Sequence, residues 1–248
     1  QRLGFKIEPR TRELLADSLP TLSRVTGSRI RHEIELGLSE TDPERVMKRL
    51  SELEVMGHIQ DGLTWTDEAQ RYYGRILRFM ADDIWHDAIT ESTKEFLYFT
   101  LWVVPLPLNI QEETVKRLRG RKTTRDDVLA VSELLLMVKR LQAEPKPSQI
   151  ARTCRHFRDR VLLAARIVLD DNQLGTYLDR YFGELRHIKT TLRGDDLQAL
   201  GIRPGPSYAV YLNRLLDARM DGLVNDKEGE CLLLAEIVSE AGEEDQLN

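Results

Sequence analysis

Apolar residues recur along most of the chain at spacings of three and four, which place them on one face of an α-helix. One such stripe runs through residues 149–169 and consists of Ile150, Cys154, Phe157, Val161, Ala165 and Val168. A second runs through residues 175–192 and consists of Leu178, Tyr181, Leu185, Ile188 and Leu192. Strand-like alternation is scarce. The pattern predicts an all-α fold, built as an elongated assembly of several packed helical segments.

Proline and glycine mark where these segments end. Asp42 is suited to cap a helix, Pro43 to occupy its first turn and Gly57 to end it, so we expect a helix over residues 43–56. Prolines at residues 105–107, 145–147 and 204–206 predict loops. We therefore divide the chain into segments 1–62, 63–144 and 145–240. We expect the acidic end, residues 241–248, to be disordered.

Length, composition and charge limit the classes of protein to which the chain can belong. At 248 residues the chain can bury a sizeable core, and no apolar run approaches the roughly 18 residues of a membrane span. Two cysteines, Cys154 and Cys231, lack a metal-binding spacing and are typical of reduced thiols in the cytoplasm. The net charge of −5 argues against nucleic-acid binding, because domains that bind nucleic acids are usually basic.

The sharpest motif in the second half of the chain is RGDDLQALGIRPGP, at residues 193–206. It predicts a short helix ended by Gly201, a tight turn and a new helix from Pro206 to Asp221, which Gly222 ends. Gly205, beside the start of that helix, lets another backbone approach closely. The first N–H groups of the helix suit a phosphate, although an ordinary helical hairpin without a ligand fits the same pattern.

A second motif near the N-terminus joins this one in a family resemblance. Its residues are Arg2, Leu3, Gly4, Phe5, Ile7, Pro9 and Thr11, then Thr26, Gly27, Ser28, Arg29, Ile30 and Glu33. The two motifs resemble the neck and the tail of the tRNA nucleotidyltransferase family, which comprises CCA-adding enzymes, A-adding enzymes and their bacterial poly(A) polymerase relatives. Ser28 stands where the family has a glutamate.

The resemblance implies an organisation and a function. Residues 1–62 would be part of the neck, 63–144 the body and 145–240 the tail. The family's catalytic head, which binds Mg²⁺ on a D-x-D pair and takes ATP and CTP as substrates, would lie before Gln1. The chain itself is then expected to have no catalytic residue, no metal and no cofactor, and not to be an enzyme on its own.

The same resemblance implies partners. They are tRNA and the missing head of the same protein, with no membrane. Arg29 and Glu33 are implied to brace the neck. We expect the chain to be cytoplasmic and to hold the acceptor and T arms of tRNA while the head adds CCA or A to the 3′ end.

Basic residues between the two motifs are the candidate RNA contacts. One cluster surrounds Gly120, and two helix faces repeat basic residues at spacings of three and four. Aligned cations of this kind bind phosphates, although a solvated helix face fits the same pattern. The residues predicted to bind RNA are Lys116, Arg117, Arg119, Arg121, Lys122, Arg125, Arg152, Arg155, Lys189, Arg203 and Gly205.

Two other functions compete with this interpretation. The pair His86-Asp87, with His58 before it and Asp126 or Asp127 after it, has the order of an HD-type metal phosphohydrolase, although a single H-D dipeptide is close to chance. The other alternative is a non-catalytic helical scaffold that docks protein partners through acidic surfaces. A salt-dependent affinity for RNA would separate RNA binding from the scaffold function.

Overall fold

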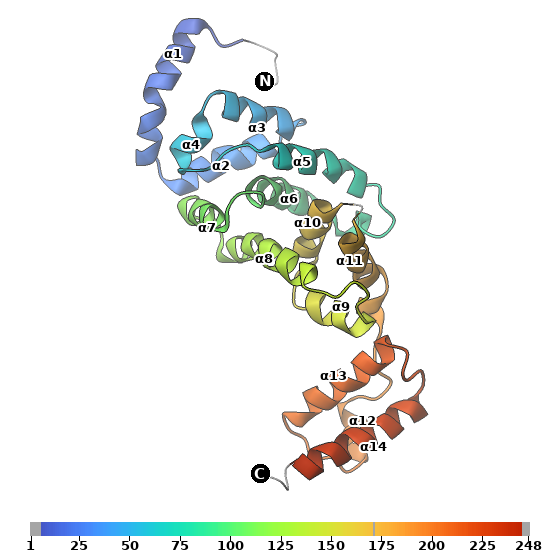
Figure 1. The fold of residues 1–248 in the computed structure, drawn as a ribbon. Coiled ribbons are helices and arrows are strands. Elements are labelled where there is room, and N and C mark those ends of the chain that lie inside the picture. The colour runs from blue at the N-terminus through green and yellow to red at the C-terminus, as the bar shows by residue number, and fades with distance from the viewer. Residues whose placement is uncertain (1–5, 171, 245–248) are drawn as a thin grey trace. The chain divides into compact units, whose positions relative to one another are not determined.

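Helices make up all the regular structure that the chain forms in its described residues, which are 6–170 and 172–244 (Figure 1). This computed structural model holds fourteen α-helices, three short 3-10 helices and no strand within those residues. The all-α prediction is confirmed. The chain divides into two compact units: Gln1–Lys139 with Phe157–Gly175 is unit 1, and Arg140–His156 with Thr176–Asn248 is unit 2. Arg2, Leu3, Gly4 and Phe5 of the N-terminal motif lie outside the described residues.

Unit 1 contains the helices from α1 to α8 and helix α10. The first are α1 (Pro9–Ser18), η1 (Leu19–Arg24), α2 (Gly27–Leu38), α3 (Pro43–Glu52) and α4 (Val55–Ile59). They are followed by α5 (Asp67–Phe79), η2 (His86–Ala88), α6 (Glu91–Val103), α7 (Leu108–Arg117), α8 (Lys122–Lys139) and α10 (Asp159–Leu169). Helix α10 packs against α8, α6 and α5, so a segment distant in sequence completes the core of this unit.

Large apolar side chains fill that core. Trp85 and Trp102 are fully buried, and the indole N–H of Trp102 donates to the Thr64 carbonyl at 2.9 Å. Trp65 stands edge-on to Tyr73, with ring centroids 4.8 Å apart. Buried aromatic groups of this size dominate the apolar area that stabilises a small helical unit.

Unit 2 contains α9 (Pro147–Cys154), most of α11 (Gln173–Gly183), η3 (Leu185–His187), α12 (Gly194–Ala199), α13 (Ser207–Met220) and α14 (Lys227–Glu244). Helices α13 and α14 pack against each other (Figure 1). Their core is an apolar cluster of Leu192, Leu197, Leu215, Leu234 and Ile237.

A buried carboxylate ties the segment before α12 to α14. Glu230 is 0% exposed, and it accepts the backbone N–H groups of Thr191 at 3.0 Å and Leu192 at 2.8 Å. Its remaining lone pairs accept a bond from the guanidinium of Arg219 at 2.6 Å. A buried charge is tolerated when it is paired and hydrogen-bonded in this way.

The helix ends differ from two of the predictions. Asp42 does cap α3, accepting the Arg45 N–H at 3.0 Å, but the predicted helix 43–56 breaks because Glu54 has a left-handed φ of 57°. Gly57 therefore lies inside α4 and ends nothing.

The predicted continuous helix 149–169 also breaks, between α9 and α10. Arg158 adopts extended backbone angles there, with φ −72° and ψ 153°. Residues Phe157–Gly175 consequently pack with unit 1, although we assigned all of 145–240 to the tail. At the C-terminus α14 continues to Glu244, so the first four residues of the segment predicted to be disordered are helical, and the rest of it, 245–248, lies outside the described residues.

Candidate RNA-binding surface

The largest predicted cluster of basic residues lies on the turn between α7 and α8 in unit 1. Helix α7 ends at Arg117, Leu118 caps it, and Arg119 takes a left-handed φ of 51° before α8 begins at Lys122. We call residues 116–125 the basic turn. The predicted members that it brings together are Lys116, Arg117, Arg119, Arg121, Lys122 and Arg125.

Arg117 is the member whose guanidinium is already occupied. One of its terminal nitrogens donates to the carbonyls of Leu22 at 3.1 Å and Val25 at 2.9 Å, at the end of η1 and just after it. The residue is half-buried. Arg117 therefore fastens η1 to α7, a role that its position in a basic cluster does not reveal.

Four other members of the basic turn present unoccupied charges. Their side chains are exposed, and within the described residues none of them makes a hydrogen bond or an ion pair. They are Lys116, Arg119, Arg121 and Lys122. Arg125 is half-buried, and its Nε is buried without a hydrogen-bond partner in the described part of the chain. Unpaired cations on one turn are the side chains that phosphate groups can engage at little cost.

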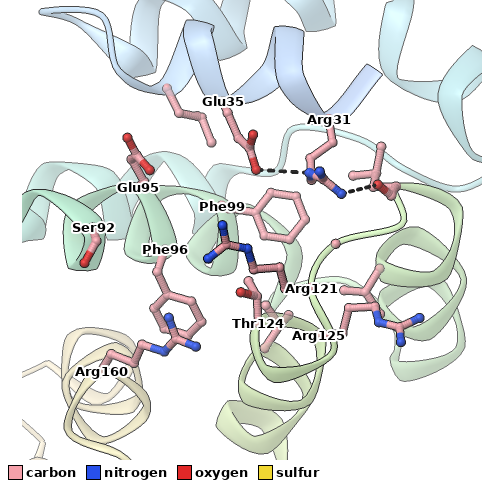
Figure 2. Close-up of a pocket in the computed structure, with 15 residues that line it drawn as sticks. Arg31, Glu35, Ser92, Glu95, Phe96, Phe99, Arg121, Thr124, Arg125 and Arg160 are labelled. Carbon is pink, nitrogen blue, oxygen red and sulfur yellow. Dashed lines mark hydrogen bonds and ion pairs between the residues drawn. The ribbon is translucent and has the colours of Figure 1, made fainter. Parts of the chain in front are cut away.

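Arg31 of α2 holds the turn in place. Its guanidinium donates to the carbonyl of Leu118 at 3.3 Å and to that of Arg119, and it forms an ion pair with Glu35 at 3.2 Å (Figure 2). A guanidinium satisfies the unpaired carbonyls at the end of a helix well, because it is a cation at the negative end of the dipole. The cation pattern of the sequence does not single out Arg31, although its pairing with Glu35 at i, i+4 is visible there.

A pocket opens beside the basic turn. It has a volume of about 370 Å³ and is lined from α2, α6, α7, α8 and α10. Its charged lining consists of Arg31, Arg121, Arg125, Arg160, Glu35 and Glu95, and its aromatic lining consists of Phe96 and Phe99 (Figure 2). With four guanidinium groups and two carboxylates, the lining residues carry a positive formal net charge.

One wall of the pocket is fixed by a buried acid. Asp127 is 6% exposed and accepts bonds from Arg158 at 2.9 and 3.0 Å and from the Nε of Arg160 at 2.7 Å. The Arg160 guanidinium also lies 4.5 Å from the centre of the Phe96 ring. Both the charge of Arg160 and the face of Phe96 are thus engaged within the protein.

The predicted RNA-binding residues of unit 2 fall into two kinds. Arg152 donates to Asp217 from Nε at 2.9 Å, and this hydrogen bond raises the pKa of Arg152. Arg155 donates to the side chain of Asn213 at 3.2 Å. Lys189 and Arg203 are exposed and make no hydrogen bond or ion pair in the part of unit 2 that the structure describes.

The turn between α12 and α13 has the predicted shape. Gly201 has a φ of +82°, its N–H donates to the Gln198 carbonyl at 3.0 Å, and the Ile202 N–H donates to the Leu197 carbonyl at 3.1 Å, the Schellman pattern that ends α12. Gly222 ends α13 in the same way, with a φ of +74°. Gly205, in contrast, has no positive φ, and nothing lies within 4 Å of the position a Cβ would take.

Arg29 and Glu33, predicted to brace the neck, are both exposed on α2. The described residues give no ion pair between them. The i, i+4 ion pair on this helix joins Arg31 to Glu35 instead, two residues further along the chain.

The residues of the phosphohydrolase alternative do not assemble. His86 and Asp87 pair with each other at 3.0 Å in the exposed turn η2, and Asp127 is bound by two arginines. Among the residues described, no group of three or more His, Cys, Asp or Glu side chains is arranged to hold a metal ion. The donor set therefore does not fit the metal centre of that alternative.

The sequence of the chain is similar to those of known RNA-processing proteins. Residues 4–65 match a family model described as the probable RNA and SrmB-binding site of polymerase A. The A-adding tRNA nucleotidyltransferase of Geobacter sulfurreducens is 25% identical over an alignment 256 positions long, which covers 97% of this chain. The chain is therefore similar in sequence to part of a tRNA nucleotidyltransferase. The resemblance drawn from the two motifs is thereby confirmed.

Solved tRNA nucleotidyltransferase structures share the fold. The Thermotoga maritima CCA-adding enzyme complexed with tRNA matches 97% of this chain with a TM-score of 0.71 and 19% identity, and an apo form of a CCA-adding enzyme matches 95% with a TM-score of 0.70 and 19% identity. The chain spans 28% of the Geobacter protein and 58% and 55% of these two solved chains. No helix in the described residues is long and apolar enough to cross a membrane.

Proposed function

We propose that the chain binds tRNA and holds its acceptor and T arms while a catalytic head of the same protein extends the 3′ end. One observation carries this proposal. In a chain related along 97% of its length to a tRNA nucleotidyltransferase, a well-fixed turn presents four exposed cations with no protein partner among the described residues. The overall net charge of −5 makes such a concentration of free positive charge informative.

Recognition would rest on phosphates and on the shape of the RNA. The grooves of A-form RNA give side chains little access to base edges, so a body that grips the acceptor and T arms reads backbone geometry. We assign the phosphate contacts to Lys116, Arg119, Arg121 and Lys122, with Lys189, Arg203 and the start of α13 beside Gly205 as the contacts of unit 2. Arg117, Arg152 and Arg155 act chiefly through the protein groups they bind.

Chemistry is assigned to the head. In this proposal the head would bind Mg²⁺ and select ATP or CTP, because the 248-residue sequence contains no D-x-D pair. We expect the chain alone to add no nucleotide. Incubation with tRNA, Mg²⁺ and labelled ATP or CTP tests this, and incorporation above background would show that the chain carries its own active site. A cytoplasmic location is part of the same proposal.

The binding proposal is tested by titrating tRNA into the 248-residue chain over a range of salt concentrations. Affinity that falls linearly on a log–log plot is expected, since each neutralised phosphate releases counterions. An acidic helical scaffold would give no such affinity, and that result would reject the proposal.

A protein partner for the N-terminal region is the second candidate. The family description that matches residues 4–65 names SrmB beside RNA, and α1 has no buried residue, with Leu14 53% exposed. An affinity purification with and without ribonuclease distinguishes a direct protein partner from one that RNA bridges. A Leu14→Ser variant should release only a direct partner.

A further inference from the structure

The pocket beside the basic turn contains charged groups and an aromatic ring that make no hydrogen bond or ion pair within the described residues. Arg31 is bound to two carbonyls and Glu35, and Arg160 to Asp127 and Phe96, so neither is free. The side chain of Arg121 makes no hydrogen bond or ion pair within the described residues. Figure 2 shows its side chain reaching from the start of α8 back over the pocket toward Phe99.

Phe99 supplies the aromatic face. It lines the pocket from α6, is half-buried, and lies at right angles to the fully buried Trp102, with ring centroids 6.0 Å apart and an interplanar angle of 85°. A ring packed at right angles to a buried neighbour keeps a fixed orientation. An aromatic face at the rim of a basic groove is the feature on which unpaired bases stack.

Glu95 adds an acceptor one helical turn before Phe99. It lines the same pocket, is exposed, and has no hydrogen-bond or ion-pair partner within the described residues. A carboxylate repels a phosphate but accepts hydrogen bonds from the exocyclic amino group of a base, as when Glu contacts the N4 amine of cytosine. Its presence favours a ligand with a phosphate at one end and an amino group at the other.

We infer that this pocket binds one unpaired nucleotide of the RNA. Its phosphate pairs with Arg121, its base stacks on Phe99, and an exocyclic amino group donates to Glu95. The volume of about 370 Å³ is within the range of small-ligand sites. The inference rests on the proposed RNA binding and deepens it: besides phosphates on the surface, the body reads one base that is not in a duplex.

The test compares short unpaired RNA with duplex RNA. Five-nucleotide oligocytidine and oligouridine differ at C4 of the base, an amine in one and a carbonyl in the other, and are similar in size and charge. We expect the 248-residue chain to bind oligocytidine at least about five-fold more tightly than oligouridine. A Glu95→Ala variant should bind the two strands alike.

Phe99→Leu keeps an apolar side chain but removes the stacking face. It should weaken oligocytidine binding about five- to hundred-fold, and Phe99→Tyr should restore most of the affinity. Arg121→Gln should weaken the binding of both oligocytidine and oligouridine. A blunt RNA duplex should bind wild type and Phe99→Leu equally, since its bases are already stacked. Thermal unfolding followed by circular dichroism establishes that each variant is folded. If Phe99→Leu does not fold, the variants of the exposed residues Arg121 and Glu95 still test the inference.

Several outcomes would overturn the inference. Equal binding of oligocytidine and oligouridine, no loss in Phe99→Leu, or competition by inorganic phosphate as strong as that by cytidine monophosphate would each leave only an anion site. If tRNA still binds with a steep salt dependence, the proposed function stands and only the nucleotide pocket is wrong. If neither tRNA nor the short strands bind, both proposals fail.

Discussion

The Cα of Gly27 lies against the carbonyl oxygen of Arg117, so close that a Cβ on Gly27 would stand 1.7 Å from that oxygen. Gly27 is the first residue of α2, and Arg117 is the last of α7. The guanidinium of Arg117 binds the carbonyls of Leu22 and Val25 just before α2. The backbone and the side chain of Arg117 therefore both hold the end of α7 against the segment from η1 to the start of α2. The basic turn starts at this junction.

Gly27→Ala should destabilise unit 1, because its methyl group meets a backbone oxygen that cannot rotate away. We expect a loss of about 1–3 kcal/mol in the free energy of unfolding, the usual cost of overpacking. Gly74→Ala is the matched control: Gly74 is exposed inside α5 with nothing within 4 Å of the position a Cβ would take, and alanine there should add about 0.5–1 kcal/mol. Urea denaturation measures both changes. Equal stability of Gly27→Ala and wild type would contradict the close packing.

The sequence predicts some of these features and conceals others for physical reasons. Gly201 and Gly222 are readable in advance because a left-handed helix end favours glycine whatever surrounds it. The contact of Gly27 with Arg117 is not, since it joins residues far apart in the chain and depends on how two helices pack. Local periodicity likewise predicts α10 but misses the break before it, where Arg158 pairs with Asp127 on a different helix.

The candidate site shows the same limit. A run of cations at residues 116–125 predicts where charge gathers, but charge alone does not separate Arg117, which binds carbonyls, from Arg121, which is free within the described residues. Phe99 and Arg31 carry no local signal of a pocket, because the cavity forms only when α2, α6 and α8 come together.

Arg117→Gln should reduce stability more than it reduces RNA binding. Its guanidinium spans two carbonyls that would lose their partner, at a cost of about 1–2 kcal/mol. The salt dependence of tRNA affinity, measured at a temperature where the variant is fully folded, should be that of wild type. Arg121→Gln is the opposite case, with unchanged stability and a shallower salt slope. A shallower slope in Arg117→Gln would show that this arginine reaches phosphate after all.

Gly201 and Gly205 should respond differently to alanine. Gly201 has a φ of +82°, where an L-residue is strained by about 1–2 kcal/mol, so Gly201→Ala should lower the stability of unit 2 by that amount. Gly205 lies outside the left-handed region and has open space around it, so Gly205→Ala should stay within about 0.5 kcal/mol of wild type. Thermal unfolding followed by circular dichroism reports both. A larger loss in Gly205→Ala than in Gly201→Ala would contradict the turn geometry.

Cys154 should resist alkylation in the native protein while Cys231 reacts. Burial raises the pKa of the Cys154 thiol to about 12, so the reactive thiolate is nearly absent at neutral pH. Because the folded-state pKa lies above the unfolded value of about 8.5, this group stabilises the fold below that pH. Its contribution falls as pH rises through the window between about 8.5 and 12. Maleimide labelling followed by peptide mass spectrometry measures the two rates, and equal rates would show that Cys154 is accessible.

The four free cations of the basic turn should carry a measurable share of the salt dependence of tRNA binding. Replacing Lys116, Arg119, Arg121 and Lys122 together with glutamine removes four candidate phosphate partners while leaving Arg117 to hold the turn. The slope of log affinity against log salt should become shallower by roughly 0.7–0.9 for each phosphate that the variant no longer neutralises.

The control for this variant removes charge from elsewhere on the surface. Arg71 forms an exposed i, i+3 pair with Glu68 at 3.0 Å, and Arg180 lies 3.9 Å from Glu184, so glutamine at both positions lowers the net charge without touching the basic turn. If the turn contacts phosphate directly, the slope of log affinity against log salt becomes shallower only in the four-fold variant. General electrostatic attraction is screened within about 8–10 Å at these salt concentrations, so removing the two control charges should leave the slope unchanged. A slope that falls equally per charge in both variants would mean that the turn is an ordinary solvated face.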